Sequence, residues 1–251
     1  MKPILPKVAF TIFGIPVMWY GILIGLGMLA GSYAGLKEAK RKGIKEEDLT
    51  DMLFYILPMA IIGARLYFVI FNWDYYGKNL NQIINIREGD LAIHGGIILS
   101  VIVAYIFCKK RKISFSKMAD IAAPGLALGQ AIGRWGNFIN EEAYGVETSL
   151  PWGVIIDGKK HHPTFLYESI GNILIFMFLL YYARKKQKQG EDGKIFSLYM
   201  IFYGTIRFFI EGLRTDSLMF FNLRIAQIVS IIFVLLGIVF ILIQKKSNKN
   251  I

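Results

Sequence analysis

The chain has 251 residues, of which 55% are apolar and only 19% are charged, a composition too apolar for an ordinary soluble domain or a disordered chain. Its single cysteine, Cys108, excludes an intramolecular disulfide and a multi-cysteine metal site, and no His-Glu-x-x-His motif occurs, so we expect no metal. With 29 Lys and Arg against 18 Asp and Glu, the formal net charge is +11. We therefore expect a basic protein that crosses a membrane several times.

Seven stretches are apolar and long enough to span a hydrocarbon layer of about 30 Å, which takes about 20 helical residues. We place them at 17–36, 51–72, 91–108, 118–138, 166–184, 195–213 and 225–244. The apolar run before the first stretch is short and lacks a small-residue cleavage site, so it does not indicate a cleaved signal. The predicted fold class is all-α. We expect a polytopic bundle of seven transmembrane helices in one integral membrane domain over residues 1–251, with a short extracytoplasmic loop region near 139–165.

The basic residues alternate along the chain. Successive connections, from the N-terminal segment to the C-terminal tail, contain two, five, two, five, two, five, two and three Lys and Arg residues. The positive-inside rule then predicts an N-terminus outside and a C-terminus in the cytoplasm. We interpret the excess positive charge as a topology signal facing anionic membrane lipids, and we expect no nucleic-acid partner.

Three further arginines, Arg65, Arg134 and Arg207, lie inside predicted spans. Each costs at least about 2.5–3.5 kcal/mol on insertion scales and therefore needs a partner or a function. With the orientation above, polar residues of six predicted helices reach one depth in the outer half of the bilayer. Besides the arginines, this set contains Tyr20, His94, Asn137, Asn140, Glu142, His162, Glu168, Glu211 and Arg214.

Two interpretations of this polar level compete. Arg207 and Glu211 are four residues apart and can form a simple buried pair, and an arginine near the interface can extend to water. Guanidinium groups, however, match phosphate oxygens in bidentate geometry and keep their charge in an apolar environment. We therefore predict a pocket in the outer leaflet for an anionic phosphate, such as a phospholipid head group.

Glycines recur at helical spacing in the first predicted helix (Gly21, Gly25, Gly27, Gly31 and Gly35) and in the fourth (Gly125, Gly129 and Gly133). This pattern is typical of helices that pack closely, and we predict that role for most of them. Gly95 and Gly96 follow His94 and leave two possibilities open. They can admit a ligand beside the imidazole, or they can allow a neighbouring backbone to approach.

The sequence of residues 133–145 is GRWGNFINEEAYG, which fills every fixed position of the signature of the prolipoprotein diacylglyceryl transferase family. The chain resembles this family in further motifs, in the family's order: WYG at 19–21, GAR at 63–65, HGG at 94–96, HP-x-x-LYE at 162–168 and YG-x-x-RF-x-x-E-x-x-R at 203–214. One departure is Phe165, which stands where many members carry glutamine.

This resemblance implies an enzyme, a transferase that catalyses the first step of bacterial lipoprotein maturation. The diacylglyceryl group of phosphatidylglycerol passes to the thiol of the lipobox cysteine in the signal peptide of a preprolipoprotein. The products are a thioether and glycerol 1-phosphate. The resemblance also implies a bacterial cell (cytoplasmic) membrane location, an active site toward the outer leaflet, and no cofactor.

The resemblance and the depth argument together give the candidate site. The catalytic candidates are His94, Arg134 and Arg207. The candidates for substrate binding are Arg134, Tyr20, Asn137, Asn140, Glu142, Gly145, Tyr203, Glu211, Arg214 and Arg65. For His94, with an ordinary pKa near 6.5, a general base and an orienting hydrogen-bond partner are both open. Cys108 is expected at the opposite side of the membrane.

A transporter for an anionic solute or a lipid is the alternative function, because it also needs buried arginines. The polar residues gather at one level and do not trace a path, and no inverted repeat is visible, which argues against a transporter. An intramembrane protease is disfavoured because neither G-x-S-x-G nor GxGD occurs.

Overall fold

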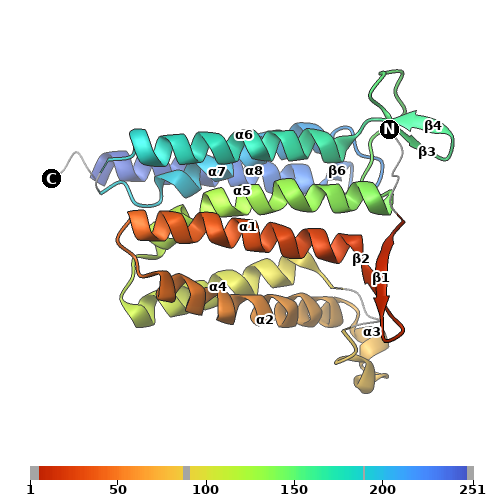
Figure 1. The fold of residues 1–251 in the computed structure, drawn as a ribbon, viewed down its shortest axis with the longest axis horizontal. Helices are drawn as coiled ribbons and strands as arrows, with labels where there is room; N and C mark the ends of the chain where they lie inside the picture. The colour runs from red at the N-terminus through yellow and green to blue at the C-terminus, as the bar shows by residue number, and fades with distance from the viewer. Residues whose placement is uncertain (1–5, 87–90, 189, 248–251) are drawn as a thin grey trace. The chain divides into compact units, whose positions relative to one another are not determined.

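Seven long helices dominate the part of the chain that the computed structural model describes, residues 6–86, 91–188 and 190–247 (Figure 1). They are α1 (Trp19–Arg41), α2 (Glu46–Phe71), α4 (Ile93–Arg111), α5 (Phe115–Asn140), α6 (Thr164–Lys185), α7 (Lys194–Glu211) and α8 (Ile225–Ser247). Each coincides with a predicted apolar stretch, which confirms the predicted all-helical class. Two shorter helices, α3 (Trp73–Tyr76) and η1 (Leu80–Gln82), follow α2. Three residues of the charge count, Lys2, Arg87 and Lys249, lie outside the described residues.

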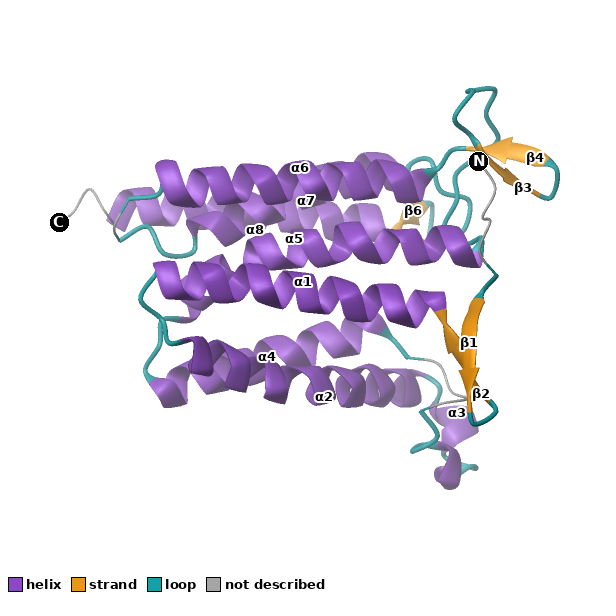
Figure 2. Cartoon of the chain, in the orientation of Figure 1, coloured by secondary structure: helices purple, strands orange, loops and turns teal. Residues whose placement is uncertain are grey.

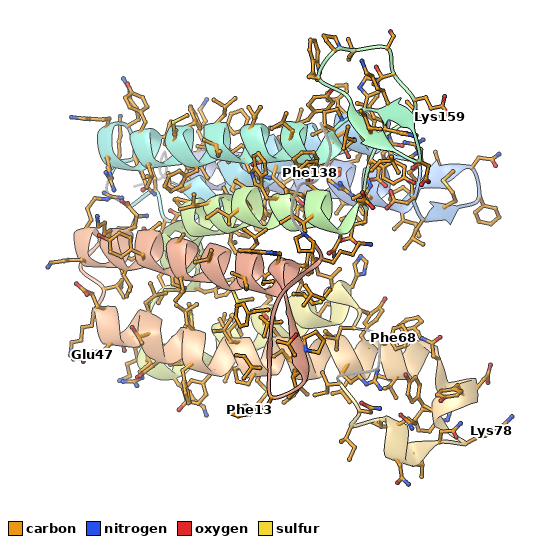
Figure 3. All side chains as sticks on the ribbon, turned by 45° about the vertical axis from the view of Figure 1, so that its right-hand side comes forward. Phe13, Glu47, Phe68, Lys78, Phe138 and Lys159 are labelled. Atoms are coloured by element: carbon orange, nitrogen blue, oxygen red, sulfur yellow. The ribbon has the colours of Figure 1, made fainter. Side chains whose placement is uncertain are left out.

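Three short antiparallel hairpins, which the apolar pattern does not predict, lie in the connections (Figure 2). Their strands are β1 (Val8–Ile12) with β2 (Ile15–Met18), β3 (Val154–Ile156) with β4 (Lys159–His161), and β5 (Met219–Phe220) with β6 (Leu223–Arg224). The first hairpin turns at Phe13 and Gly14, whose φ angles are 48° and 79°. Positive φ at both positions is what a tight two-residue hairpin turn requires. Figure 3 shows Phe13 at the tip of this hairpin.

Five of the long helices, α1, α2, α4, α6 and α8, are long and apolar enough to cross a membrane, as judged over the described residues. In α8 only 11% of the most apolar part is buried within the protein. An apolar helix with so little protein cover needs lipid around it, which identifies a membrane protein. α5 and α7 do not belong to this group, and a count of seven membrane crossings stays a prediction.

The chain divides into two compact units, residues 1–37 with 119–251, and residues 38–118. α1 and α5 each continue from one unit into the other. We call them the large and the small unit and describe each by itself. The prediction of a single domain stays a prediction.

In the small unit, α2 and α4 pack through glycines. A Cβ atom placed on Gly95 would lie only 2.2 Å from the carbonyl oxygen of Gly63. A Cβ atom on Gly96 would lie 3.0 Å from the carbonyl oxygen of Ala60. Of the two possibilities left open for Gly95 and Gly96, the structure thus favours close backbone approach.

In the large unit, α5, α6 and α7 share a core. Its buried members are Ala123, Ala127, Ile175, Leu179, Ala183, Ile195, Tyr199 and Met200. α1 lies against α5 where Gly27 faces Gly129 and Gly31 faces Gly125. The predicted packing role is confirmed for these four glycines. Nothing lies within 4 Å of a Cβ atom built on Gly21, Gly25 or Gly133.

The Gly31→Ala substitution is expected to lower the free energy of unfolding by about 1–3 kcal/mol, the usual cost of overpacking. The added Cβ atom would lie 2.5 Å from the carbonyl oxygen of Gly125, so α1 and α5 would have to separate. Denaturant unfolding in detergent micelles measures the change. Gly25→Ala is the matched control on the same helix, where the added atom meets nothing and alanine favours the helix. Equal losses in both variants would contradict close packing at Gly31.

Asp120 closes the connection between α6 and α7 at the opposite end of α5 from the motif GRWGN. It is 2% exposed and accepts hydrogen bonds from Gln187 Nε2 (2.7 Å) and from the backbone nitrogens of Gly193 (2.9 Å) and Phe196 (2.8 Å). A carboxylate at the N-terminus of α7 satisfies backbone N–H groups that have no partner within the helix. These three hydrogen bonds fix where α7 begins. They therefore also fix the position of the polar residues of α7 along the helix axis.

Candidate functional site

A buried carboxylate, Glu168 near the start of α6, joins two of the predicted arginines. Arg134 of α5 places Nη2 2.6 Å from Glu168 Oε2, and Arg207 of α7 donates from Nη1 to Glu168 Oε1. The two guanidinium groups therefore bind the two oxygens of one carboxylate and must lie beside each other. Residues 73 positions apart in the sequence meet because α5, α6 and α7 share the core described above.

The ion pairs continue from Arg207 along α7 and beyond it. Arg207 Nη2 lies 2.6 Å from Glu211 Oε2, one helical turn later, and Arg214 Nε lies 3.9 Å from the same oxygen. Arg214 also binds Asp216 through both carboxylate oxygens, at 2.9 and 2.7 Å. We call these six residues the ion network: Arg134, Glu168, Arg207, Glu211, Arg214 and Asp216.

Apart from Asp216, whose side chain is 48% exposed, the ion network is largely removed from solvent. Glu168 and Glu211 are each 2% exposed, and the side chains of Arg134, Arg207 and Arg214 are 22%, 15% and 13% exposed. Burying such charges is costly unless each has a partner of opposite sign. Alternation of sign along the network supplies those partners, and the partly exposed arginines remain able to receive a ligand.

Asp216 lies beyond the end of α7. Because the Arg214 guanidinium donates to both of its oxygens, the pKa of Asp216 lies below its usual value, although partial burial acts in the opposite direction. Asp216 thus stays charged down to a lower pH than a solvated aspartate, and it loses its hold on Arg214 only when the pH falls through that lowered pKa.

Asparagine and glutamate side chains extend the site along α5. Arg134 Nη1 donates to Asn137 Oδ1 at 3.3 Å, and Asn137 Nδ2 donates to Glu142 Oε1 at 2.8 Å. Asn140 ends α5, and its buried Oδ1 has no hydrogen-bond partner among the described residues. The Tyr20 ring lies where a side chain on Gly136 would be, 2.5 Å from a Cβ atom built there.

Two other predicted residues, Tyr203 and Gly145, contact residues next to the ion network or within it. Tyr203 stacks on Tyr199 with 5.5 Å between ring centroids, and the Tyr199 hydroxyl donates to Gln130 Oε1 at 3.0 Å. Gly145 is buried, forms a β-bridge with Arg214, and donates its backbone N–H to the carbonyl oxygen of His162 at 2.9 Å. The bridge connects the loop after α5 to the segment that carries Arg214.

Phe165, the departure from the family pattern, is buried in an aromatic cluster. Its ring stacks on Phe138 with 4.5 Å between centroids and meets Trp135 edge-on at 5.5 Å. Figure 3 marks Phe138 on α5. Trp135 donates its indole N–H to Ser169 Oγ at 3.1 Å, one residue after Glu168. The cluster fixes α6 against α5 directly beside the ion network.

Arg65 and His94 belong to the small unit. Arg65 is 4% exposed, donates to the carbonyl oxygens of Gln82 (2.6 Å) and Ile83 (2.9 Å), and lies over the Tyr76 ring at 5.0 Å. These contacts hold the loop after α2 in place. His94 is exposed in the first turn of α4, with its ring 6.2 Å from that of Tyr67. A role for either residue at the ion network stays a prediction.

Glu168 and Asp216 belong to the ion network but are not among the predicted catalytic or substrate-binding residues. Glu168 lies at the predicted polar level and within the LYE motif, so its position was a usable signal. Asp216 follows the last motif, and no sequence pattern marked it as a site residue. The described residues contain no group of three His, Cys, Asp or Glu side chains placed to hold a metal ion.

Comparison with known proteins agrees with this arrangement. The family model described as prolipoprotein diacylglyceryl transferase matches residues 7–243. Curated proteins named phosphatidylglycerol–prolipoprotein diacylglyceryl transferase match over nearly the whole chain. That of Finegoldia magna is 56% identical (98% of this chain, 97% of that protein), that of Clostridioides difficile 52% (97% of each), and that of Bacillus cereus strain Q1 48% (98% and 95%). These names do not favour a transporter.

Proposed function

Since the chain belongs to the prolipoprotein diacylglyceryl transferase family, we propose that it transfers the diacylglyceryl group of phosphatidylglycerol to the lipobox cysteine of a preprolipoprotein. The bond between the glycerol carbon of the diacylglyceryl group and the phosphate oxygen breaks. A thioether forms at that carbon, and the phosphate leaves with the other glycerol as glycerol 1-phosphate. The names of the relatives support the two substrates. The lipobox cysteine as the acceptor rests on the resemblance of the motifs.

The observation that carries this proposal is the pair of guanidinium groups on Glu168. Arg134 and Arg207 bind different oxygens of one carboxylate, so the two guanidinium groups lie beside each other, and Arg207 also pairs with Glu211. A phosphodiester also presents two anionic oxygens, and the same two cations can bridge it from their solvent-facing edges. As the leaving phosphate gains charge, both cations would stabilise it.

The remaining candidate residues would orient these cations and the head group. Asn137 and Glu142 extend from Arg134, and Glu211 and Arg214 extend from Arg207. Tyr20, Asn140, Gly145 and Tyr203 would shape the surrounding space, and Arg65 would bind substrate or hold its loop. The attacking thiol has an ordinary pKa near 8.5, and nearby guanidinium groups would favour its thiolate.

For the topology, we propose seven membrane crossings with the N-terminus outside and the C-terminus in the cytoplasm of a bacterium. Alternation of basic residues supports this orientation. The ion network would then lie in the outer half of the bilayer, at the C-terminal ends of α5 and α7 and the N-terminal end of α6. A preprolipoprotein that has crossed the membrane would reach it there.

The deciding experiment mixes the purified chain, phosphatidylglycerol vesicles and a peptide containing a lipobox cysteine. We expect the peptide to gain the mass of one diacylglyceryl unit and an equal amount of glycerol 1-phosphate to appear. A matched peptide with serine in place of cysteine should remain unmodified. Absence of the mass gain with active relatives as positive controls would overturn the proposal.

The His94→Gln substitution separates the two roles left open for His94. If the imidazole is the base that removes the thiol proton, the rate of transfer should fall by about 10²–10⁴-fold and should depend less on pH than in the wild type. Glutamine keeps hydrogen-bonding capacity but cannot take up a proton at neutral pH. Substantial activity with an altered KM would instead indicate an orienting role. A pH–rate profile of both proteins distinguishes these outcomes.

A further inference from the structure

A second level of polar side chains lies next to the ion network, among α5, α6 and α7 of the large unit. Gln130 precedes Arg134 on α5 by four residues, and Tyr203 precedes Arg207 on α7 by four. Residues four apart lie on one face of a helix, about 6 Å apart along its axis. Gln130 and Tyr203 therefore share the helix faces that present the two guanidinium groups to Glu168.

This second level lies nearer the middle of the helices than the ion network does. Arg134 is six residues from the end of α5, and Gln130 is ten. Arg207 is four residues from the end of α7, and Tyr203 is eight. For helices that cross the bilayer as proposed, a group nearer the middle of the helix lies nearer the acyl chains. The cations of the ion network thus come at the level of the phosphate, and Gln130 and Tyr203 come below it.

The side-chain amide of Gln130 is held in one orientation. Tyr199 is 5% exposed, and its hydroxyl donates to Gln130 Oε1 at 3.0 Å. A buried phenol needs an acceptor for its proton, and within the described part of the chain the amide oxygen is that acceptor. This bond turns Nε2 away from Tyr199, and both N–H groups of Nε2 have no partner among the described residues.

Tyr203 supplies a second donor at the same level. Its ring stacks on that of Tyr199, with 13° between the ring planes. Among the residues that the structure describes, the Tyr203 hydroxyl has no hydrogen-bond partner. Gln130 and Tyr203 are both half-buried, so a lipid that enters the site can reach their polar atoms.

We propose that the amide nitrogen of Gln130 and the hydroxyl of Tyr203 bind the ester carbonyl oxygens of the phosphatidylglycerol that the enzyme consumes. An ester carbonyl accepts hydrogen bonds and donates none, so it fits these two donors. The ester groups of a phospholipid lie a few covalent bonds from its phosphate, on the side of its acyl chains. A lipid whose phosphate binds Arg134 and Arg207 would therefore place its esters at the second level. This inference rests on the proposed function and topology.

Contacts to the esters would fix the glycerol of the lipid from a second side. The carbon that the sulfur attacks lies between the phosphate and the two carbons that carry the esters. Binding on both sides restricts the position and direction of this carbon, which lowers the entropic part of the barrier. Neither ester bond breaks in the transfer, so Gln130 is a binding residue that selects how the acyl chains are linked to the glycerol.

Two lipids that differ only in this linkage test the proposal. The purified full chain receives phosphatidylglycerol with ester-linked chains or its dialkyl ether analogue of equal chain length, with a lipobox cysteine peptide as acceptor. We expect the wild type to favour the ester lipid in kcat/KM. Gln130→Met should lower this preference by about two- to tenfold, the usual range for one hydrogen bond. Transfer from the ether lipid should be unchanged, since that lipid has no carbonyl to bind.

Two further variants make the result specific. Gln227→Met removes an amide of α8 that donates to the carbonyl oxygen of Phe208 at 3.2 Å, and it should keep the wild-type preference. Tyr199→Phe keeps the stack on Tyr203 but lets the Gln130 amide turn. Its preference for the ester lipid should therefore fall between those of the wild type and Gln130→Met.

An equal loss of transfer from both lipids in Gln130→Met, or no preference for the ester lipid in the wild type, would overturn the inference. Native mass spectrometry with each lipid and no peptide repeats the comparison without turnover. Stronger retention of the ester lipid that depends on Gln130 would support the ester contacts even if no transfer occurs. A failure of this inference is thus distinguishable from a failure of the proposed function.

Discussion

The Arg134→Ala substitution is expected to slow diacylglyceryl transfer by at least about 10²- to 10³-fold. A loss of this size is usual when an enzyme loses one hydrogen-bond donor that stabilises charge in the transition state. Arg134→Ala removes one of the two guanidinium groups that share Glu168. Arg207 remains to pair this carboxylate, so the protein should still fold and insert. Initial rates with phosphatidylglycerol vesicles and a lipobox peptide measure the loss, and a saturation series separates kcat from KM.

Two companion variants control this experiment. Lys117→Ala removes a half-buried cation from the other end of α5 and should leave the rate unchanged. Arg134→Lys retains the charge but not the planar fork, and its rate should stay close to that of Arg134→Ala if bidentate contact matters. Normal turnover in Arg134→Ala would remove this residue from the account of phosphate binding.

Loss of the shared carboxylate is expected to affect stability more than loss of either arginine. Glu168→Gln leaves two buried guanidinium groups without a common anion, and breaking a buried ion pair in this way costs about 3–5 kcal/mol. The substitution also frees the guanidinium groups of Arg134 and Arg207 from their fixed positions. The rate of transfer should therefore fall together with the free energy of unfolding. Unfolding by denaturant in micelles gives the free energy, and the peptide assay gives the rate.

Glu147→Gln is the control, because Glu147 is likewise an ion-paired glutamate but binds only one cation, Lys159 at 2.6 Å, at the exposed β3–β4 hairpin. Exposed ion pairs contribute little to stability because water screens them, so little change is expected. Glu168→Asp keeps the charge on a shorter side chain and should fall between Glu168→Gln and the wild type. Wild-type stability in Glu168→Gln would show that the arginines are held by other contacts.

The apolar pattern predicted the seven helices well, because each coincides with a long run of apolar residues. It predicted where the helices end less well. The first helix extends to Arg41, five residues beyond the predicted end at residue 36, since lysine, glutamate and arginine continue a helix readily outside the apolar layer. The hairpins escaped prediction because their strands have two to five residues, too few to show a period.

The sequence predicted the depth at which the candidate site lies, but not the ion pairs and hydrogen bonds that form it. Helix direction and charge counting placed Arg134, Arg207 and Glu211 at a common depth. Only tertiary packing of α5, α6 and α7 brings Glu168 between the two arginines, and no spacing within the sequence encodes that contact. Conversely, Arg65 shares the unusual feature of an arginine in a span, yet its hydrogen bonds go to the loop at residues 82–83.

The shared carboxylate also has a consequence for biosynthesis. α5 and α7 carry the arginines and are not among the five helices apolar enough to cross a membrane by themselves, whereas α6, which carries Glu168, is. A nascent chain that has released only α5 and α6 can pair Glu168 with Arg134, but the second contact of this carboxylate, with Arg207, forms only after α7 follows. Integration of these three segments should therefore be cooperative, because the ion pairs of the candidate site form completely only when all three helices are in place.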